Sequence, residues 1–331
     1  MNSNIDLVVT WVDGSDPAWL KQRQFYEPGK KITKASCESR DWGWMRYWFR
    51  GVEQNLPWIR RIHFVTWGHL PNWLNCNHPK LHVVRHEDFI PAEYLPTFSS
   101  HPIEWNMHRI EGLSEQFIYA NDDMYFIGSS KPDDYFQNGF PCDCLCLRLI
   151  TDSYTGDFGH IIWNNISCIN RHFLLKDCMN QNEDKFFASV YSPNILAMNK
   201  AGYQLRNFPG FLDEHLPIAF LKSSFETIWK AEPQLLRRTC HHRFRSIWDV
   251  SDWLVRYWQL ADGNFVPRMP RGKAITLAEP PELLRDTILN PLYTVICLND
   301  SRDAIDFEEH STYLCNLFEM ILPEMSSFEL Y

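Results

Sequence analysis

The stretch "IDLVVTWVDGSDPAW", residues 5–19, places an apolar run directly before a glycine-containing turn and a proline. Residues 5–12 are apolar enough to predict a buried strand. The chain must turn after this strand, because Gly14 permits positive φ and Pro17 sets the φ of a helix start. Asp16 precedes that proline and is expected to cap the helix. The stretch therefore predicts a strand–turn–helix unit that leaves Asp13 at the strand end.

The alternation of short apolar runs and amphipathic windows continues through the N-terminal half. Strands are expected at residues 59–67, 81–86 and 117–120, and helices at residues 40–55 and 102–110. Strands separated by helices are typical of a mostly parallel sheet that is covered on both faces. The predicted fold class is therefore α/β and Rossmann-like.

Composition narrows the class of protein. Lys and Arg total 32 against 41 Asp and Glu, and this net charge of −9 argues against nucleic acid as a partner. The N-terminus lacks a basic region and its apolar run is interrupted by Asp6, so neither a signal peptide nor a membrane span is expected, and we expect a cytoplasmic protein. The ten cysteines are expected to be reduced. Cys142, Cys144 and Cys146 fit one face of a buried strand better than a zinc site.

Two expected strands end in acidic clusters, "DGSD" and "NDD". In an open α/β sheet, ligand sites form beyond the carboxyl ends of the strands. Asp122 and Asp123 are therefore expected to bind a divalent cation on a diphosphate, because Mg²⁺ prefers carboxylate and phosphate oxygens. A simple Asn-Asp-Asp turn is the alternative interpretation of the same residues.

The C-terminal half supplies groups of the opposite charge. His215 lies in "DEHLPIAF", and Arg243 and Arg245 lie in "CHHRFRSIWD". Arginine binds phosphate through its planar fork, and a histidine can take a proton from a hydroxyl. The alternatives are a structural histidine before Pro217 and a solvated basic helix face.

These stretches, in this order, resemble the Stealth family. "IDLVVTWVDGSDPAW" resembles its first region, and "SRDWGWMRYWFRGVEQNLPWIRRIHFVTWGHLPNWL" with "LPTFSSHPIEWNMHRIEGLSEQFIYANDDMYF" resembles its second. "EHLP" with "RFRSIWDVSD" is similar to the third region, and "VICLND" to the fourth. The resemblance spans nearly the whole chain.

The resemblance implies a sugar-1-phosphate transferase with a glycosyltransferase-A-like sheet and a helical insertion or subdomain. It implies a UDP-sugar donor, Mg²⁺ or Mn²⁺, an oligosaccharide or polysaccharide acceptor, and release of UMP, as in capsule synthesis. The catalytic positions would be Asp41, His215 and Arg245, with His215 or Asp41 as the base, and the metal positions Asp122 and Asp123. The donor-binding candidates are Asp13, Asp16, Arg46, Glu104, Arg243 and Asp300.

Two other functions remain open at this point. An inverting glycosyltransferase would use the same donor and metal but would release UDP. A non-catalytic carbohydrate-binding module would use some of the 14 Trp residues to stack on sugar rings. The chain also departs from the family pattern at Trp44, Trp48, Gly51, Trp67 and His69, and these changes are expected to reshape the sugar or acceptor pocket.

The expected organisation is one catalytic domain. Residues 1–130 would form the α/β donor-binding half, 131–210 a mixed continuation with a helix near 183–190, and 211–290 a mainly helical active-site segment. Residues 291–331 would supply a last strand, at 294–298, and an amphipathic tail that packs against the core. A peripheral contact with a membrane-bound polysaccharide export assembly would suit a cytoplasmic enzyme of this kind.

Overall fold

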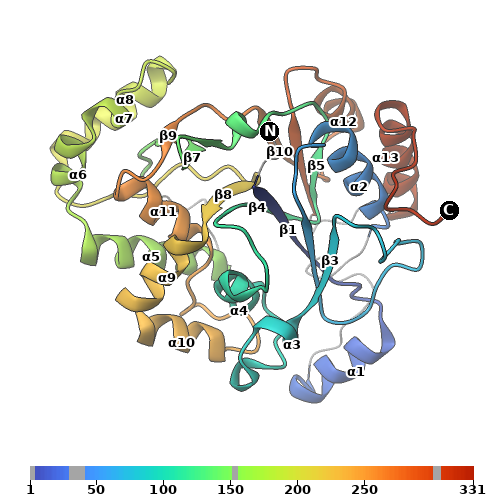
Figure 1. Cartoon of the computed structure of the whole chain (residues 1–331). Helices are drawn as coiled ribbons and strands as arrows, with labels where there is room; N and C mark the ends of the chain where they lie inside the picture. The colour runs from blue at the N-terminus through green and yellow to red at the C-terminus, as the bar shows by residue number, and fades with distance from the viewer. Residues whose placement is uncertain (1–3, 30–41, 151–155, 301–306) are drawn as a thin grey trace.

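A five-stranded sheet forms the centre of the molecule (Figure 1). The computed structural model describes residues 4–29, 42–150, 156–300 and 307–331. The strand order is β3-β2-β1-β4-β8. The strands β1, β2, β3 and β4 are parallel to one another, and β8 is antiparallel to β4. The strands are β1 (Ile5–Trp11), β2 (Ile62–Thr66), β3 (Leu81–Arg85), β4 (Gln116–Asn121) and β8 (Ile218–Leu221). The predicted mostly parallel, Rossmann-like α/β fold is confirmed.

Strand β1 is buried on both of its faces. Val8 joins one hydrophobic core with Phe117, whereas Leu7 and Val9 join a second core with Ile118 on the other side of the sheet. A strand covered on both faces needs apolar residues at successive positions. This explains why the first segment of the sequence is a continuous apolar run.

Helices cover the two faces of the sheet (Figure 1). Helix α1 (Pro17–Tyr26) follows β1, and α3 (His86–Phe89) follows β3. The helices that contribute to the Val8 core are α4 (Ser100–Asn106), α5 (Gly156–His172), α6 (Leu175–Gln181), α7 (Glu183–Phe186), α8 (Pro193–Ala201), α9 (Lys222–Ala231), α10 (Pro233–His241) and α11 (Trp253–Ala261). The helices that contribute to the core on the other face of the sheet are α2 (Met45–Asn55), α12 (Pro281–Ile288) and α13 (Phe307–Ile321). Short 3₁₀ turns lie at Ala92–Tyr94, Met107–Arg109, Pro132–Asp134 and Gly202–Gln204.

Two smaller sheets extend the central one. The first has the order β10-β11-β5, and the second has the order β6-β7-β9. Their strands are β5 (Met124–Phe126), β6 (Phe136–Gln137), β7 (Phe140–Asp143), β9 (Val266–Pro267), β10 (Gly272–Thr276) and β11 (Val295–Asn299). A two-residue turn, Asp122 and Asp123, carries the chain from β4 in the central sheet into β5. One of the acidic clusters thus lies where two sheets meet.

The last strand and the tail confirm their predictions. Strand β11 occupies the range expected at 294–298, and α13 buries Leu314 and Phe318 against the core. Among the residues that the structure describes, no helix is both long enough and apolar enough to cross a membrane.

The middle of the chain differs from the expectation. Four helices lie between residues 156 and 201, although only the one near 183–190 was expected, and β8 lies in a range expected to be mainly helical. Cys144, Leu145 and Cys146 are all buried beyond the end of β7, so the expected strand alternation does not hold there. The nine cysteines within the described ranges are all free, which confirms the prediction of reduced thiols for them.

Candidate active site

The turn between β4 and β5 fixes the position of Asp123. Strand β5 pairs with β11, where Met124 lies opposite Cys297, and the backbone carbonyl of Asp123 accepts a hydrogen bond from Leu298 at 2.9 Å. This pairing brings together residues that are about 170 positions apart in the chain. It places the Asp123 carboxylate beside the buried thiol of Cys297.

His215 faces this carboxylate from the segment before β8. Its Nε2 lies 3.6 Å from Asp123 Oδ2 and 3.4 Å from the amide nitrogen of Asn121. Burial alone would lower the pKa of His215, but the negative charge of Asp123, with smaller contributions from Glu104 and Asp122, raises it above the usual imidazole value. The imidazole is only partly exposed, so it can reach a ligand bound at the turn.

The residues at this turn fit a divalent cation. Asp123 Oδ1 is buried and accepts no hydrogen bond within the described part of the chain. Ligand atoms of Asp123, His215 and Cys297 all lie within 4.8 Å of one another. A carboxylate suits Mg²⁺ or Mn²⁺. Asp122, the neighbouring predicted metal residue, belongs to the same turn.

Two carboxyl groups lie beneath the site. Glu104, on α4, accepts a hydrogen bond from the backbone N–H of Asp252 at 3.3 Å, and both residues are buried. Burial and the adjacent charge of Glu104 raise the pKa of Asp252 well above its usual value. The sequence predicts no role for Asp252, because it lies 148 positions from Glu104 and no motif links the two residues.

The end of β1 forms the second acidic part of the site edge. Asp16 accepts hydrogen bonds from the backbone N–H groups of Ala18 at 2.9 Å and Trp19 at 2.8 Å, which confirms the predicted N-cap of α1. The Asp13 carboxylate accepts from the N–H and the hydroxyl of Ser15, at 2.8 and 2.6 Å. The backbone N–H of Asp13 donates to Nε2 of His69 at 2.7 Å. The turn after β1 is thereby linked to the loop after β2.

The two predicted phosphate-binding arginines lie on the loop after α10. Arg243 donates to the carbonyl of Pro96 at 2.8 Å, and its guanidinium lies 4.2 Å from the ring centroid of Tyr26 on α1. Arg245 is exposed. Asp249 holds this loop, because its carboxylate accepts from the backbone N–H of Ser246 at 2.9 Å.

Three predicted residues, Arg46, Asp300 and Asp41, remain to be placed. Arg46 donates to the backbone carbonyl of Tyr331 at 2.6 Å, so it binds the chain end. Asp300 directly follows β11 and accepts from the indole nitrogen of Trp42 at 3.1 Å. Asp41 lies outside the described residues. The structure thus brings Asp122, Asp123, His215 and Glu104 together, and it leaves Arg46 elsewhere.

The fold and this site define a class: a Rossmann-like α/β protein whose central sheet ends in an acidic, cation-fitting turn opposite a histidine. Comparison with known proteins gives the family. The model of Stealth protein conserved region 1 matches residues 3–31, and that of conserved region 2 matches residues 38–142.

Relatives match over the full length of the chain. A capsular polysaccharide phosphotransferase WcwK of Streptococcus pneumoniae is 38% identical over 99% of this chain and 100% of its own. A receptor polysaccharide phosphotransferase WefC of Streptococcus gordonii is 36% identical over 100% of both chains. The exopolysaccharide phosphotransferase cps2G of Lactiplantibacillus plantarum is 36% identical over 98% of this chain and 96% of its own. The chain belongs to the Stealth family.

Proposed function

We propose that this protein is a sugar-1-phosphate transferase of surface polysaccharide synthesis. It moves a hexose- or N-acetylhexosamine-1-phosphate from a UDP-sugar to a glycan hydroxyl, which leaves a phosphodiester and releases UMP. The observation that carries the proposal is the Asp123–His215 pair, 3.6 Å apart at the carboxyl edge of the sheet. The relatives named polysaccharide phosphotransferases, which match the full chain, support the same reaction class.

In the proposed reaction the acceptor oxygen attacks the sugar-side phosphorus of the donor. The new O–P bond forms as the bridging P–O bond of the diphosphate breaks, and UMP leaves with the electron pair. His215 takes the hydroxyl proton, because its Nε2 is the basic atom that faces the acidic turn. Asp123 orients the imidazole by its negative charge, and Asp41 is the second candidate for the base.

Other side chains have supporting roles in this proposal. Asp122 and Asp123 would hold Mg²⁺ or Mn²⁺, which neutralises charge on the leaving phosphate. Arg245 would bind a phosphate oxygen of the donor, and its exposure leaves the guanidinium accessible. Asp13 would contact the donor from the end of β1.

The first experiment identifies the released nucleotide. The purified chain is incubated with Mg²⁺, a pool of bacterial surface oligosaccharides and a panel of UDP-sugars, and UMP is separated from UDP by anion exchange. We expect UMP to appear only with metal and acceptor, and to fall by about 10²-fold or more in His215→Ala. Asp123→Asn should also lower the turnover, and added metal should restore part of it.

A matched control distinguishes catalysis from folding. His160→Ala changes an exposed histidine on α5 and should leave the rate unchanged. Release of UDP would make the protein an inverting glycosyltransferase. Glycan binding without any nucleotide release would favour the carbohydrate-binding module.

We also propose a place of action. An enzyme that uses a UDP-sugar works in the cytoplasm, and one that builds a surface polysaccharide delivers its product to a membrane-bound export assembly. A peripheral contact with that assembly is therefore expected. Sedimentation of the protein with isolated membranes, lost after a high-salt wash, would test this contact.

A further inference from the structure

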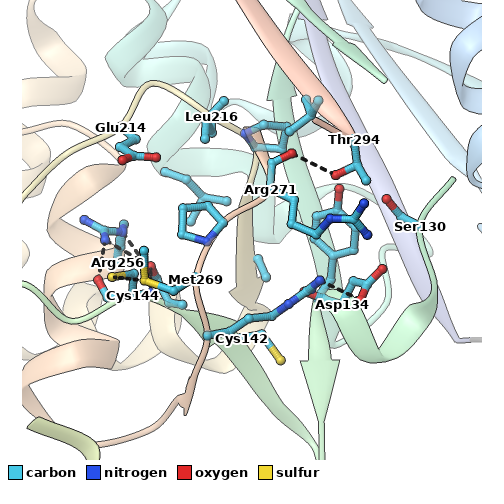
Figure 2. Close-up of a pocket in the computed structure, with 18 of the residues that line it drawn as sticks. Ser130, Asp134, Cys142, Cys144, Glu214, Leu216, Arg256, Met269, Arg271 and Thr294 are labelled. Atoms are coloured by element: carbon cyan, nitrogen blue, oxygen red, sulfur yellow. Dashed lines mark hydrogen bonds and ion pairs between the residues drawn. The ribbon is translucent and has the colours of Figure 1, made fainter. Parts of the chain in front are cut away.

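A hollow lies between segments of both halves of the chain, from Ser130 to Val295 (Figure 2). The cavity itself has a volume of about 110 Å³ and is partly open to solvent. Its walls come from β7, the segment before β8, the start of β8, the loop between β9 and β10, and the start of β11. A ligand larger than this cavity would extend from it into the solvent.

The hollow and the Asp123–His215 pair share two structural elements. Glu214 and Leu216 line the hollow, and His215 between them turns toward Asp123. Val295 on β11 also lines the hollow, and Cys297, two residues further on the same strand face, lies next to Asp123. The hollow thus lies next to the chain segments that carry His215 and Cys297.

Two of the three arginines that line the hollow are neutralised by carboxylates. Arg256 pairs with Asp143 at 2.8 Å and with Asp213 at 2.9 Å, and Arg268 pairs with Asp134 at 2.6 Å. These pairs hold the walls together, because each joins segments from different elements. They leave no net positive charge at those positions.

Glu214 and Arg271 differ from these pairs. Within the described residues neither side chain has an ion pair or a hydrogen bond, and Figure 2 shows them at opposite sides of the hollow. Apolar side chains, including Leu216 and Met269, also line the hollow. A carboxylate accepts from sugar hydroxyls, a guanidinium donates to them, and an apolar floor suits the carbon face of a sugar ring.

We propose that this hollow is the acceptor site, where a glycan binds with Glu214 and Arg271 as its polar anchors and presents a hydroxyl to His215. This inference rests on the proposed function for the identity of the acceptor. It assigns to the C-terminal half a task that the acidic strand ends do not perform.

A printed array of bacterial surface oligosaccharides is the probe for this site. Fluorescently labelled wild-type protein is compared with the double variant Glu214→Gln/Arg271→Gln. The matched control is Glu282→Gln/Arg285→Gln, which removes an exposed carboxylate and an exposed guanidinium on α12. We expect the hollow variant to bind the oligosaccharides that wild type recognises at least about tenfold more weakly than wild type does. The control variant should bind them like wild type.

Two further measurements distinguish a loss of acceptor binding from binding at the donor site and from a folding defect. Excess UDP should not displace the glycan, and the hollow variant should keep the wild-type melting temperature. With an oligosaccharide found on the array, the variant should raise the KM for the acceptor and leave the KM for the UDP-sugar unchanged.

The failures of the two proposals are distinguishable. Equal binding by the hollow variant, displacement by UDP, or no binding of wild type to any oligosaccharide would each overturn the acceptor site. Release of UDP in the nucleotide assay would overturn the proposed reaction. In that case, weaker binding of the hollow variant to the array would still support the acceptor site.

Discussion

Asp13 and Asp16 lie three residues apart at the end of β1, and the structure gives them different contacts. Asp16 uses one carboxylate oxygen to cap α1, so this residue has a structural role whatever else it binds. Within the described part of the chain, the Asp13 carboxylate hydrogen-bonds only to Ser15, and the Asp13 backbone reaches His69. Of the two, Asp13 is therefore better placed to exchange its contact for a ligand.

The substitution Asp16→Ala tests the capping role. It should lower the free energy of unfolding by about 1 kcal/mol, because two backbone N–H groups of α1 lose their acceptor. Urea unfolding of wild type, Asp16→Ala and Asp16→Asn measures the effect. Asp16→Asn keeps an acceptor oxygen and should stay close to wild type. An unchanged stability of Asp16→Ala would contradict the capping role.

The departures from the family pattern separate by burial. Trp44 is 2% exposed, Trp48 is fully buried, and Gly51 packs against the backbone of Phe126, so these three lie in the core and do not reshape a pocket as expected. His69, in contrast, lies at the end of the sheet and contacts the backbone of Asp13. Sequence alone cannot distinguish these positions, because a tryptophan in a motif can face a core or a ligand equally well.

At the scale of elements, α2 is held against β5 at a very short distance. A Cβ at Gly51 would lie 2.4 Å from the backbone oxygen of Phe126, and the side-chain amide of Asn55, one turn later, donates to the same oxygen at 2.8 Å. Glycine therefore sets the spacing between this helix and the second sheet.

The substitution Gly51→Ala should reverse the usual helix preference. Alanine normally stabilises a helix by about 1 kcal/mol relative to glycine, but here the methyl group must displace β5 from α2. We expect a destabilisation of about 1–3 kcal/mol, as for an overpacked core. Thermal unfolding measures it, with Gly29→Ala as the control, since a Cβ at Gly29 meets nothing within 4 Å. A stabilised Gly51→Ala would show that the two elements can separate freely.

Elements of strong periodicity could be predicted from the sequence, and short elements could not. The strands at 59–67, 81–86 and 117–120 are confirmed because buried parallel strands give continuous apolar runs. Strand β5 has only three residues and β8 only four, so neither is long enough to show a period of two. Both depend on partners far along the chain.

The same limit applies to the candidate site. The carboxylates at strand ends could be predicted, since the ends of parallel strands converge on one edge. The contact of Asp123 with His215 and Cys297 could not, because the pairing of β11 with β5 brings Cys297 there and the antiparallel pairing of β8 with β4 brings the segment of His215. Arg271 belongs to no motif, and Glu214, although it is the first residue of "EHLP", becomes a candidate only through its place in the hollow.

At the scale of the whole molecule, the C-terminal residues close the fold over elements from the N-terminal half. Glu329 forms an isolated β-bridge with Leu74, and the backbone N–H of Leu330 donates to the carbonyl of Trp73 at 2.8 Å. The Glu329 carboxylate is fully buried and pairs with Arg50 on α2, with contacts of 3.0 and 3.2 Å. The Glu329 carboxylate thus joins α2 to the C-terminal residues, and the backbone of Glu329 and Leu330 joins them to the segment after β2.

The pKa of Glu329 is lowered in the folded protein. Burial alone would raise it, but hydrogen bonds from Arg50 and from the backbone N–H of Ser326 outweigh burial. A carboxyl group with a lowered pKa contributes stability above its unfolded pKa, about 4.5, and that contribution is lost as the pH falls through the lower folded value. This pair should therefore weaken in acid.

The substitution Glu329→Gln should destabilise the whole chain at neutral pH. Arg50 keeps Glu319 and the carbonyl of Leu322 as acceptors but loses its buried counter-charge, so we expect a loss of about 3 kcal/mol. Urea unfolding at pH 7 and at about pH 3.5 should show a smaller difference between wild type and variant in acid, because below the unfolded pKa the unfolded wild-type chain gains a proton that the folded carboxylate binds less readily. Glu324→Gln, an exposed neighbour, is the control. A constant difference at both pH values would mean that shape, and not charge, holds the chain end on α2.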